Sequence, residues 1–399
     1  MKIDLVDPAT FAAGHPLAQY DWLRTNAPVY WHEEPEGAGF WAVTSYDGVY
    51  EVDRDFQTYS SEPTIMLEDS GIENAFGEYK MMLMMDPPQH TAFRRLIREE
   101  FLPKPTLGRI PRMQQLARQI VDGVIEKGSC DFVTEVAGEM PSYVIAELMG
   151  LPLSDGRELY KLTEIIHTSP SALPPGAGGQ AVGKMFEYGM KIIAEKRARP
   201  ADDLATKLLT VEVDGRKLAD MEFLLFFMLL VDAGGDTTRN LLSAGLIELL
   251  GNPDQLAWLK ADLQGRLPAA REELLRATTP VVYMRRTARK DAVLGGQQIR
   301  DGQKVVMFFG AANRDAAHFA SPDRLNLART PNDHMAFGNG PHVCLGQHIA
   351  RIEIDAVLVE VLTRMEELKI ERPPIWLQSN FIAGPTKLDV SFKAAKRLG

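Results

Sequence analysis

Hydrophobic residues recur at three- and four-residue spacing through most of the chain from about residue 89 onward, which predicts a series of amphipathic helices. The expected helices cover residues 88–101, 110–127, 137–149, 154–168, 178–197 and 202–209. A longer pattern runs over residues 220–250, and at about 1.5 Å per residue it would span roughly 45 Å. Two more helices are expected over residues 269–277 and from residue 345 to about 365.

Strand-like runs are short and few by comparison. They occupy residues 29–31 and 39–43, after a short helix expected over residues 16–26, and a later pair lies around residues 292–307. Gly295-Gly296 and Asp301-Gly302 mark turns in that later region. Because no linker, repeat or low-complexity tract divides the 399 residues, we expect one domain covering residues 1–399, mainly α with small β-sheets.

Composition narrows the class of protein. With 45% hydrophobic and 25% charged residues the chain is of ordinary globular type, and its net charge of −10 argues against nucleic acid or an anionic membrane as a partner. The start has no apolar signal region, and the longest apolar stretch, near residues 223–231, is too short to span a membrane. We expect a cytoplasmic protein without a membrane anchor, whose two cysteines stay reduced.

One of these cysteines, Cys344, lies in the glycine-rich run 337–346, directly before a helical pattern. The N–H groups and positive dipole of a helix start favour a thiolate, and a lowered thiol pKa suits a metal ligand. One cysteine cannot build a zinc or iron–sulfur site, but it is enough as the axial ligand of a haem iron. The alternative is a packing cysteine in a tight turn, and we assign Cys130 to a packing role.

The long expected helix contains the run Ala233-Gly234-Gly235-Asp236-Thr237-Thr238. Each mid-helix glycine costs about 1 kcal/mol relative to alanine, which is explained if a flat ligand approaches the backbone or if the helix opens locally. An acid followed by a hydroxyl is a proton-delivery pair. The alternative is a kink at which the threonine bonds back to its own helix.

These two motifs resemble those of the cytochrome P450 family. The cysteine run fits the haem-binding signature Phe-x-x-Gly-x-x-x-Cys-x-Gly, and the helix run fits the family's Ala/Gly-Gly-x-Asp/Glu-Thr element. The resemblance implies a triangular prism with a long central helix over a haem b (protoporphyrin IX iron), with Cys344 as the metal ligand. It also implies that Asp236 and Thr237 are catalytic, delivering the protons that oxygen activation consumes.

Haem propionates need cations or donors. His90 and Arg94 are four apart, hence on one helix face, and resemble the family pair that binds one propionate, while Arg286 and His342 match other propionate positions. Arg285 is the weaker candidate for the Arg286 role. The expected cofactor-binding residues are His90, Arg94, Ala233, Arg286, Phe337, Gly338, His342, Cys344 and Gly346.

Glu273 and Arg276 form a Glu-x-x-Arg element that resembles a structural lock of the family, with Arg324 as its second arginine. One carboxylate between two guanidiniums accepts several charge-assisted bonds, which is a rigid arrangement when buried.

The resemblance also implies a substrate pocket. Its expected residues are Met66, Met84, Leu230, Gly234, Val281, Val282, Phe381 and Ile382. Methionine adapts to irregular apolar ligands, but the methionine-rich segment before residue 86 suits core packing equally well.

We therefore expect a soluble bacterial-type monooxygenase that hydroxylates an apolar small molecule, such as a sterol, terpenoid, alkyl or aromatic hydrocarbon. It would use O2 and two electrons from an iron–sulfur ferredoxin with its reductase, and act as a monomer. Basic residues near Arg94 and after Cys344 suggest an acidic redox partner. The alternatives are a peroxide-using haem–thiolate enzyme, or a haem protein that senses or binds a ligand without turnover.

Overall fold

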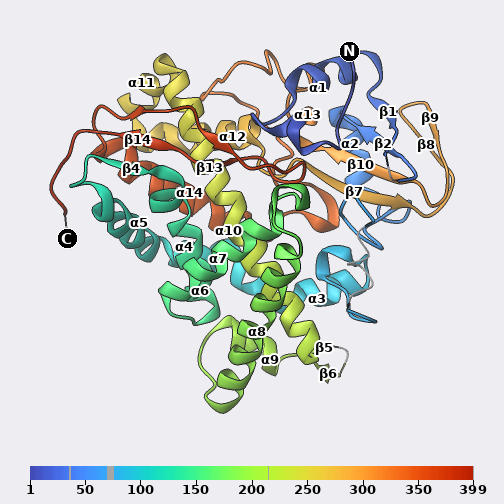
Figure 1. Ribbon diagram of the computed structural model, residues 1–399, viewed down its shortest axis with the longest axis horizontal. Helices are drawn as coiled ribbons and strands as arrows, with labels where there is room; N and C mark the ends of the chain where they lie inside the picture. Colours follow the sequence, from blue (N-terminus) through green and yellow to red (C-terminus); the bar gives the residue numbers. More distant parts are fainter. Residues whose placement is uncertain (36, 70–75, 214, 399) are drawn as a thin grey trace.

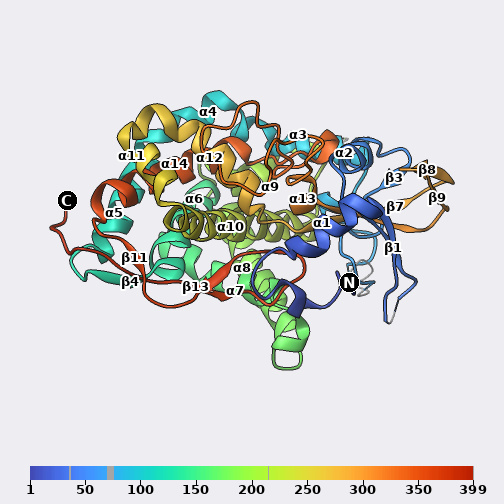
Figure 2. The ribbon, with the colours of Figure 1, turned by 90° about the horizontal axis from the view of Figure 1, so that it is seen from above.

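The computed structural model describes residues 1–35, 37–69, 76–213 and 215–398. Its central element is α10 (Asp220–Gly251), a helix of 32 residues that lies in the middle of the molecule in both views (Figures 1 and 2). The helix begins where the Glu222 carboxylate accepts a hydrogen bond from the Ala219 N–H at 2.7 Å. It stays helical through both mid-helix glycines, so the helix does not open there. The long helix predicted over residues 220–250 is confirmed.

The other helices expected from hydrophobic periodicity are present, with ends shifted by a few residues. They are α1 (Leu17–Asn26), α3 (Gln89–Arg98), α5 (Ile110–Val124), α6 (Glu139–Met149), α7 (Leu153–His167), α8 (Ala177–Ala198), α9 (Leu204–Thr210), α12 (Leu263–Thr278) and α14 (Gln347–Arg364). The largest shift is in α12, which begins six residues before its expected start. Asp262 caps it by accepting from the Gly265 N–H at 3.1 Å, and Pro268 lies inside the helix.

Several shorter helices were not expected, because each is too short to show a clear period. They are α2 (Tyr46–Arg54), α4 (Pro103–Gly108), α11 (Pro253–Ala261) and α13 (Phe309–Ala312). Single turns add η1 (Pro8–Phe11), η3 (Met82–Met84), η4 (Glu99–Phe101), η5 (Val133–Ala137), η6 (Pro170–Ala172) and η7 (Gly340–His342).

The main sheet has the strand order β1-β2-β10-β7-β3 and lies at one end of the molecule, near the N-terminus (Figure 1). Its strands are β1 (Val29–His32), β2 (Phe40–Val43), β3 (Tyr59–Ser60), β7 (Tyr283–Ala288) and β10 (Lys304–Phe308). All neighbours pair antiparallel except β2 and β10, which are parallel and bring a segment near the N-terminus beside one from the last third of the chain.

The remaining sheets are small. One joins β4 (Ser129–Asp131), β14 (Asp389–Ser391) and β11 (Lys369–Ile370), and the two-stranded pairs are β5 (Glu212–Val213) with β6 (Arg216–Lys217), β8 (Ala292–Leu294) with β9 (Gln297–Ile299), and β12 (Ile375–Trp376) with β13 (Pro385–Lys387). Cys130 pairs with Val390 in the first of these and is buried, in agreement with a packing role.

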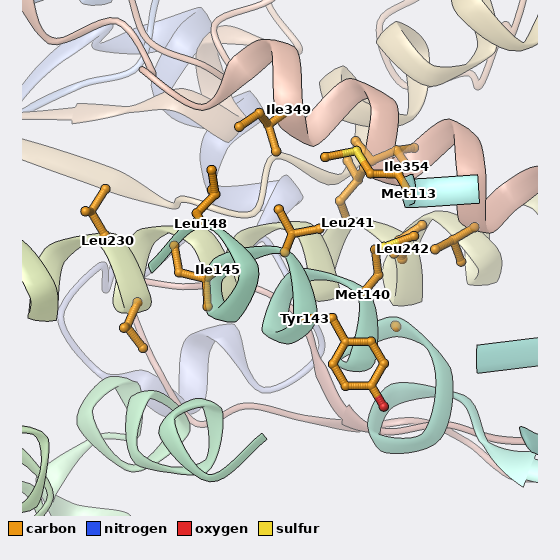
Figure 3. Close-up of a cluster of buried hydrophobic side chains, with 14 of the residues drawn as sticks. Met113, Met140, Tyr143, Ile145, Leu148, Leu230, Leu241, Leu242, Ile349 and Ile354 are labelled. Atoms are coloured by element: carbon orange, nitrogen blue, oxygen red, sulfur yellow. The ribbon is translucent and has the colours of Figure 1, made fainter. Parts of the chain in front are cut away.

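The largest hydrophobic core surrounds α10. Figure 2 shows α12 and α14 on one side of this helix and α7 and α8 on the other. In Figure 3, side chains of α6, α10 and α14 approach one another, among them Ile145, Leu230 and Ile349. Within the described part of the chain, no helix is both long and apolar enough to cross a membrane.

Candidate active site

A cavity lies between α6, α10, α14 and the loop that carries Cys344. Its walls are mostly apolar, and Figure 3 shows part of them: Ile145 and Leu148 from α6, Leu230 and Leu241 from α10. The charged wall residues are Asp53, Arg94, Arg286 and Glu353.

The loop 337–346 is held in a tight fold beside the end of α2. Gly338 and Gly340 have φ angles of +67° and +65°, a region that side chains disfavour. A Cβ on Gly340 would also lie 2.5 Å from the backbone oxygen of Asp53. The Cys344 N–H donates to the Phe337 carbonyl at 2.8 Å, which closes the loop. Both glycines are therefore required by backbone geometry, and Gly340 also by the close approach of Asp53.

The thiol of Cys344 lies at the wall of the cavity, just before α14. Burial raises its pKa, while the N–H groups of Gly346 and Gln347 and the guanidiniums of Arg94 and Arg351 act in the opposite direction. The donors at the helix start favour the thiolate, as expected, but burial outweighs them and the net direction of the pKa is upward. A bound metal ion supplies the positive charge that deprotonates a coordinating thiol.

On the α10 side, the cavity wall includes four residues with small side chains: Ala233, Gly234, Thr237 and Thr238. A Cβ on Gly234 would meet only Ile145, at an ordinary van der Waals distance of 3.5 Å. The surrounding protein therefore leaves room for a side chain at this position. The Thr237 hydroxyl donates to the Ala233 carbonyl at 3.0 Å, which is the back-bonded arrangement that the sequence left open. Thr237 thus reaches the cavity with its hydroxyl already partnered.

Asp236 faces away from the cavity, toward α7. It is 0% exposed, and His167 Nδ1 contacts its Oδ2. His167 Nε2 also lies 3.0 Å from Asp232 Oδ1, one helical turn earlier on α10. Burial alone lowers the pKa of His167, but the two carboxylates outweigh it and raise the pKa well above its usual value. The expected acid and hydroxyl are adjacent in sequence yet face different sides of α10.

The cavity thus has a single thiol at one wall and a glycine-bearing helix at the opposite wall. Residues 177–391, more than half of the chain, match the family model for cytochrome P450. The chain belongs to the cytochrome P450 family. It is 38% identical over 411 residues to cytochrome P450 126 of Mycobacterium tuberculosis, covering 98% of this chain and 97% of that protein.

Two further proteins are similar over nearly the whole length. The steroid C26-monooxygenase of M. tuberculosis is 35% identical over 403 residues, covering 96% of this chain and 90% of that protein. The structure of Mycobacterium marinum CYP268A2 in complex with pseudoionone superposes with a TM-score of 0.92 at 35% identity, covering 98% of this chain and 99% of that one. The chain is accordingly a P450 monooxygenase, a family that binds haem b through a cysteine thiolate.

The residues of this P450 fit such a group. The Cys344 thiol lies at one wall of the cavity, and the opposite helix contributes the small residues Ala233 and Gly234. Cationic or hydrogen-bonding side chains lie together at one edge. At that edge the His90 and His342 rings lie 4.0 Å apart, and Arg94 donates to the Val343 carbonyl at 2.6 Å. All of the residues expected to bind the cofactor lie on the cavity wall except His90, which is buried behind His342.

Arg286 lines the cavity as expected, but it already has an anionic partner. Its Nη2 donates to Asp53 Oδ1 at 2.9 Å, and the other oxygen of Asp53 accepts from the Asn339 N–H at 2.6 Å. Asp53, at the end of α2, therefore ties an expected propionate residue to the cysteine loop. Arg285 points elsewhere and pairs with Asp69, which agrees with its weaker candidacy.

The lock is present, with a correction to its second arginine. Glu273 accepts from Arg276 Nε and Nη2, both at 2.8 Å, and from Arg329 Nε at 2.9 Å. Arg324 was the expected partner, and this prediction is wrong: its side chain is exposed, and only its backbone carbonyl accepts bonds from the two lock arginines. The segment has no regular period, so sequence spacing cannot decide which arginine turns inward.

The expected pocket residues divide into two groups. Leu230, Gly234 and Val281 line the cavity as predicted. The rest do not, and pack instead in or against a neighbouring apolar cluster; they are Met66, Met84, Val282, Phe381 and Ile382. Consecutive residues of an extended chain face opposite sides, which separates Val282 from Val281. The resemblance also places residues 64–85 in the pocket wall, and residues 70–75 of this segment lie outside the described residues.

Sequence reasoning missed three polar residues of the site: Asp53, Glu353 and His167. Burial raises the pKa of Glu353 to about 8, against the effect of a hydrogen bond from Thr238, and its Oε2 has no partner among the described residues. None of the three belongs to a local motif, because each meets its partners across a long stretch of chain.

Proposed function

We propose that this P450 monooxygenase oxidises a neutral, apolar small molecule with a sterol- or terpenoid-like skeleton. The observation that carries the proposal is the wall between α6 and α10. It is built from Ile145, Leu148, Leu229 and Leu230, without a charged side chain among them. The charged wall residues sit instead beside the cysteine loop or, for Glu353, behind Thr238. A ligand with a carboxylate would find no cation on the apolar wall.

The related proteins support this class of substrate. One is named a steroid C26-monooxygenase, and another was solved with pseudoionone, a neutral terpenoid ketone. When bound, the haem supplies the redox chemistry by which dioxygen is reduced and one oxygen atom is inserted into the substrate. The residues of this chain hold the cofactor, shape the apolar wall and exclude water from it, and Asp236 and Thr237 of α10 supply the protons for oxygen activation.

An optical titration tests the substrate proposal. Testosterone, pseudoionone and a long-chain fatty acid are added to the purified ferric protein, and the Soret band reports displacement of water from the iron. We expect a low- to high-spin shift with a neutral ligand and a weaker one with the fatty acid. Equal or stronger binding of the carboxylate would contradict the neutral-substrate proposal while leaving the monooxygenase assignment in place.

Electrons are proposed to come from an acidic iron–sulfur ferredoxin with its reductase. Arg95, Arg98 and Lys104 are exposed near the cysteine loop and form no ion pair among the described residues, and the apolar Leu107 beside them is 58% exposed. Two further residues expected in this patch have partners elsewhere: Arg94 donates to the loop carbonyl of Val343, and Arg351 pairs with Glu272.

A charge reversal tests this docking surface. Arg98→Glu is expected to slow reduction by an acidic ferredoxin severalfold at low salt, with the difference fading at high ionic strength. Lys191→Glu, on the exposed side of α8, serves as the control for a change of net charge. Equal effects of both substitutions would contradict the patch. We also propose that the protein is a cytoplasmic monomer. Evidence that it is membrane-bound or oligomeric would revise this part of the proposal without altering the site.

A further inference from the structure

His167 is the feature of the site that the expected mechanism does not use. It is the last residue of α7, and both of its ring nitrogens face carboxylates of α10. Nδ1 contacts Asp236, and Nε2 lies 3.0 Å from Asp232. The exposed fraction of the side chain is 25% for Asp232, 7% for His167 and 0% for Asp236. The three groups therefore form a line that leads from solvent into the interior.

Further charged groups lie around these three residues. Arg239 lies beside Asp236, at 3.5 Å, and donates to Glu164 of α7 at 2.6 Å. Asp131 of β4 acts on both Arg239 and Glu164 from a greater distance. Burial raises the pKa of Glu164 to about 7.

The remaining neighbours are uncharged. The Thr163 hydroxyl donates to Asp236 at 3.4 Å, and the Phe381 ring lies 6.0 Å from that of His167. Histidine is thus the only side chain in the line whose two separate nitrogens can take up a proton on one side and release it on the other.

We propose that His167 supplies protons to Asp236 from solvent by way of Asp232, so that the interior acid is recharged through α7. This inference rests on the proposed function, in which Asp236 and Thr237 serve oxygen activation. His167 acts through Asp236 and is a positioning and proton-supplying residue. The same contacts join α7 to α10, so the route exists only while these two helices are packed together.

The proton transfer balances without any electron movement. The N–H bond at Nδ1 breaks as an O–H bond forms on the Asp236 carboxylate, which leaves a neutral imidazole. A half-turn of the ring exchanges the two nitrogens, and protonated Asp232 then restores the missing proton. Asp232 takes the replacement from water at its exposed edge. One proton has moved inward, and the histidine is again an imidazolium.

The test compares two ways of driving the same holoenzyme. One uses NADH with a surrogate ferredoxin and reductase, and needs protons from solvent. The other uses hydrogen peroxide, which brings its own protons. The ligand is whichever of testosterone and pseudoionone gives the larger spin shift. His167→Gln is expected to lower the reductant-driven rate of product formation by about tenfold or more, since positioned proton transfer contributes about 10²–10⁴-fold. The peroxide-driven rate should stay within about twofold.

Two further variants separate proton supply from simple clamping. His167→Lys keeps a cation between the carboxylates, but its single nitrogen cannot take up a proton on one side and release one on the other. It is expected to be as slow as His167→Gln with NADH, whereas a clamp role predicts a wild-type rate. His318→Gln, on the surface against Tyr46, controls for loss of a histidine and should leave both rates unchanged.

Either of two results would overturn the inference: equal losses in both assays, or no loss with NADH. If the wild-type protein forms no product by either route, the proposed function fails, and histidine NMR decides the inference separately. The His167 signals are then expected to stay in the protonated form well above pH 7. A His167 that is neutral at pH 7 would overturn the proposal whatever the turnover.

Discussion

The two sides of the cavity differ in the structural features that form them. On the cysteine side, Gly338, Gly340 and the Phe337 carbonyl fix the loop by backbone geometry, and Asp53 ties it to Arg286. On the α10 side, the backbone is a regular helix, and the distinctive features are buried acids. A fixed backbone holds the thiol at one position, whereas burial raises the pKa of Asp236 and so favours its holding a proton. The first side therefore holds a cofactor, and the second can serve chemistry that consumes protons.

The largest expected effect is on the cysteine side, where the Glu273 lock holds the segment before the loop. Glu273→Ala leaves Arg276 and Arg329 buried without their carboxylate, and breaking a buried pair in this way costs about 3–5 kcal/mol. We expect loss of haem incorporation, measured as the ratio of Soret to protein absorbance. Arg324→Ala is the matched control, since its exposed side chain is outside the lock, and it should keep full haem content. Full haem content in Glu273→Ala would refute the lock.

The next effect tests the α10 side through Thr237, which lines the cavity. Thr237→Ala should bind haem and substrate normally but yield much less product per NADH consumed, because reduced oxygen escapes as peroxide or water when proton delivery is disturbed. Thr237→Ser keeps the hydroxyl and should stay near wild-type coupling. Unchanged coupling in Thr237→Ala would remove this hydroxyl from the mechanism and weaken the contrast between the two sides.

A smaller effect concerns Glu353, whose pKa burial raises to about 8. The carboxyl is then neutral in the folded protein at pH 7 but ionised in the unfolded chain, so it destabilises the fold increasingly as pH rises from about 4.5 toward 8. Glu353→Gln removes this penalty, which at 1.36 kcal/mol per pKa unit amounts to at most about 5 kcal/mol. The variant's urea midpoint should therefore rise relative to wild type between pH 5 and pH 8. A difference that does not change with pH would show that Glu353 is ionised in the folded protein.

The sequence predicts the two sides unequally well. The cysteine loop and the α10 run are contiguous motifs, so local spacing is enough to assign their residues to the cavity. Asp236 shows the limit of this reasoning: its position in the motif is evident, but its direction depends on His167, which is 69 residues away. Asp53 likewise meets Asn339 across 286 residues of chain. Such partners are fixed by tertiary packing, which local spacing does not encode.

The same limit explains the errors at single residues. Arg324 and Arg329 lie in one irregular segment, where no period distinguishes an inward from an outward side chain. Val281 and Val282 are chemically equivalent, and only the path of the backbone decides which one faces the cavity. The long helices, by contrast, were predicted to within a few residues, with the early start of α12 as the exception, because their periodicity extends over several turns.

The most direct test of the account is the carbon monoxide difference spectrum of the reduced protein, recorded for wild type and for Cys344→Ser. We expect the strongly red-shifted Soret band of a thiolate-ligated haem in the wild type, and its loss in Cys344→Ser even where haem is retained. A wild-type protein that binds haem without this band, or a Cys344→Ser variant that keeps it, would contradict the assignment of Cys344 as the axial ligand.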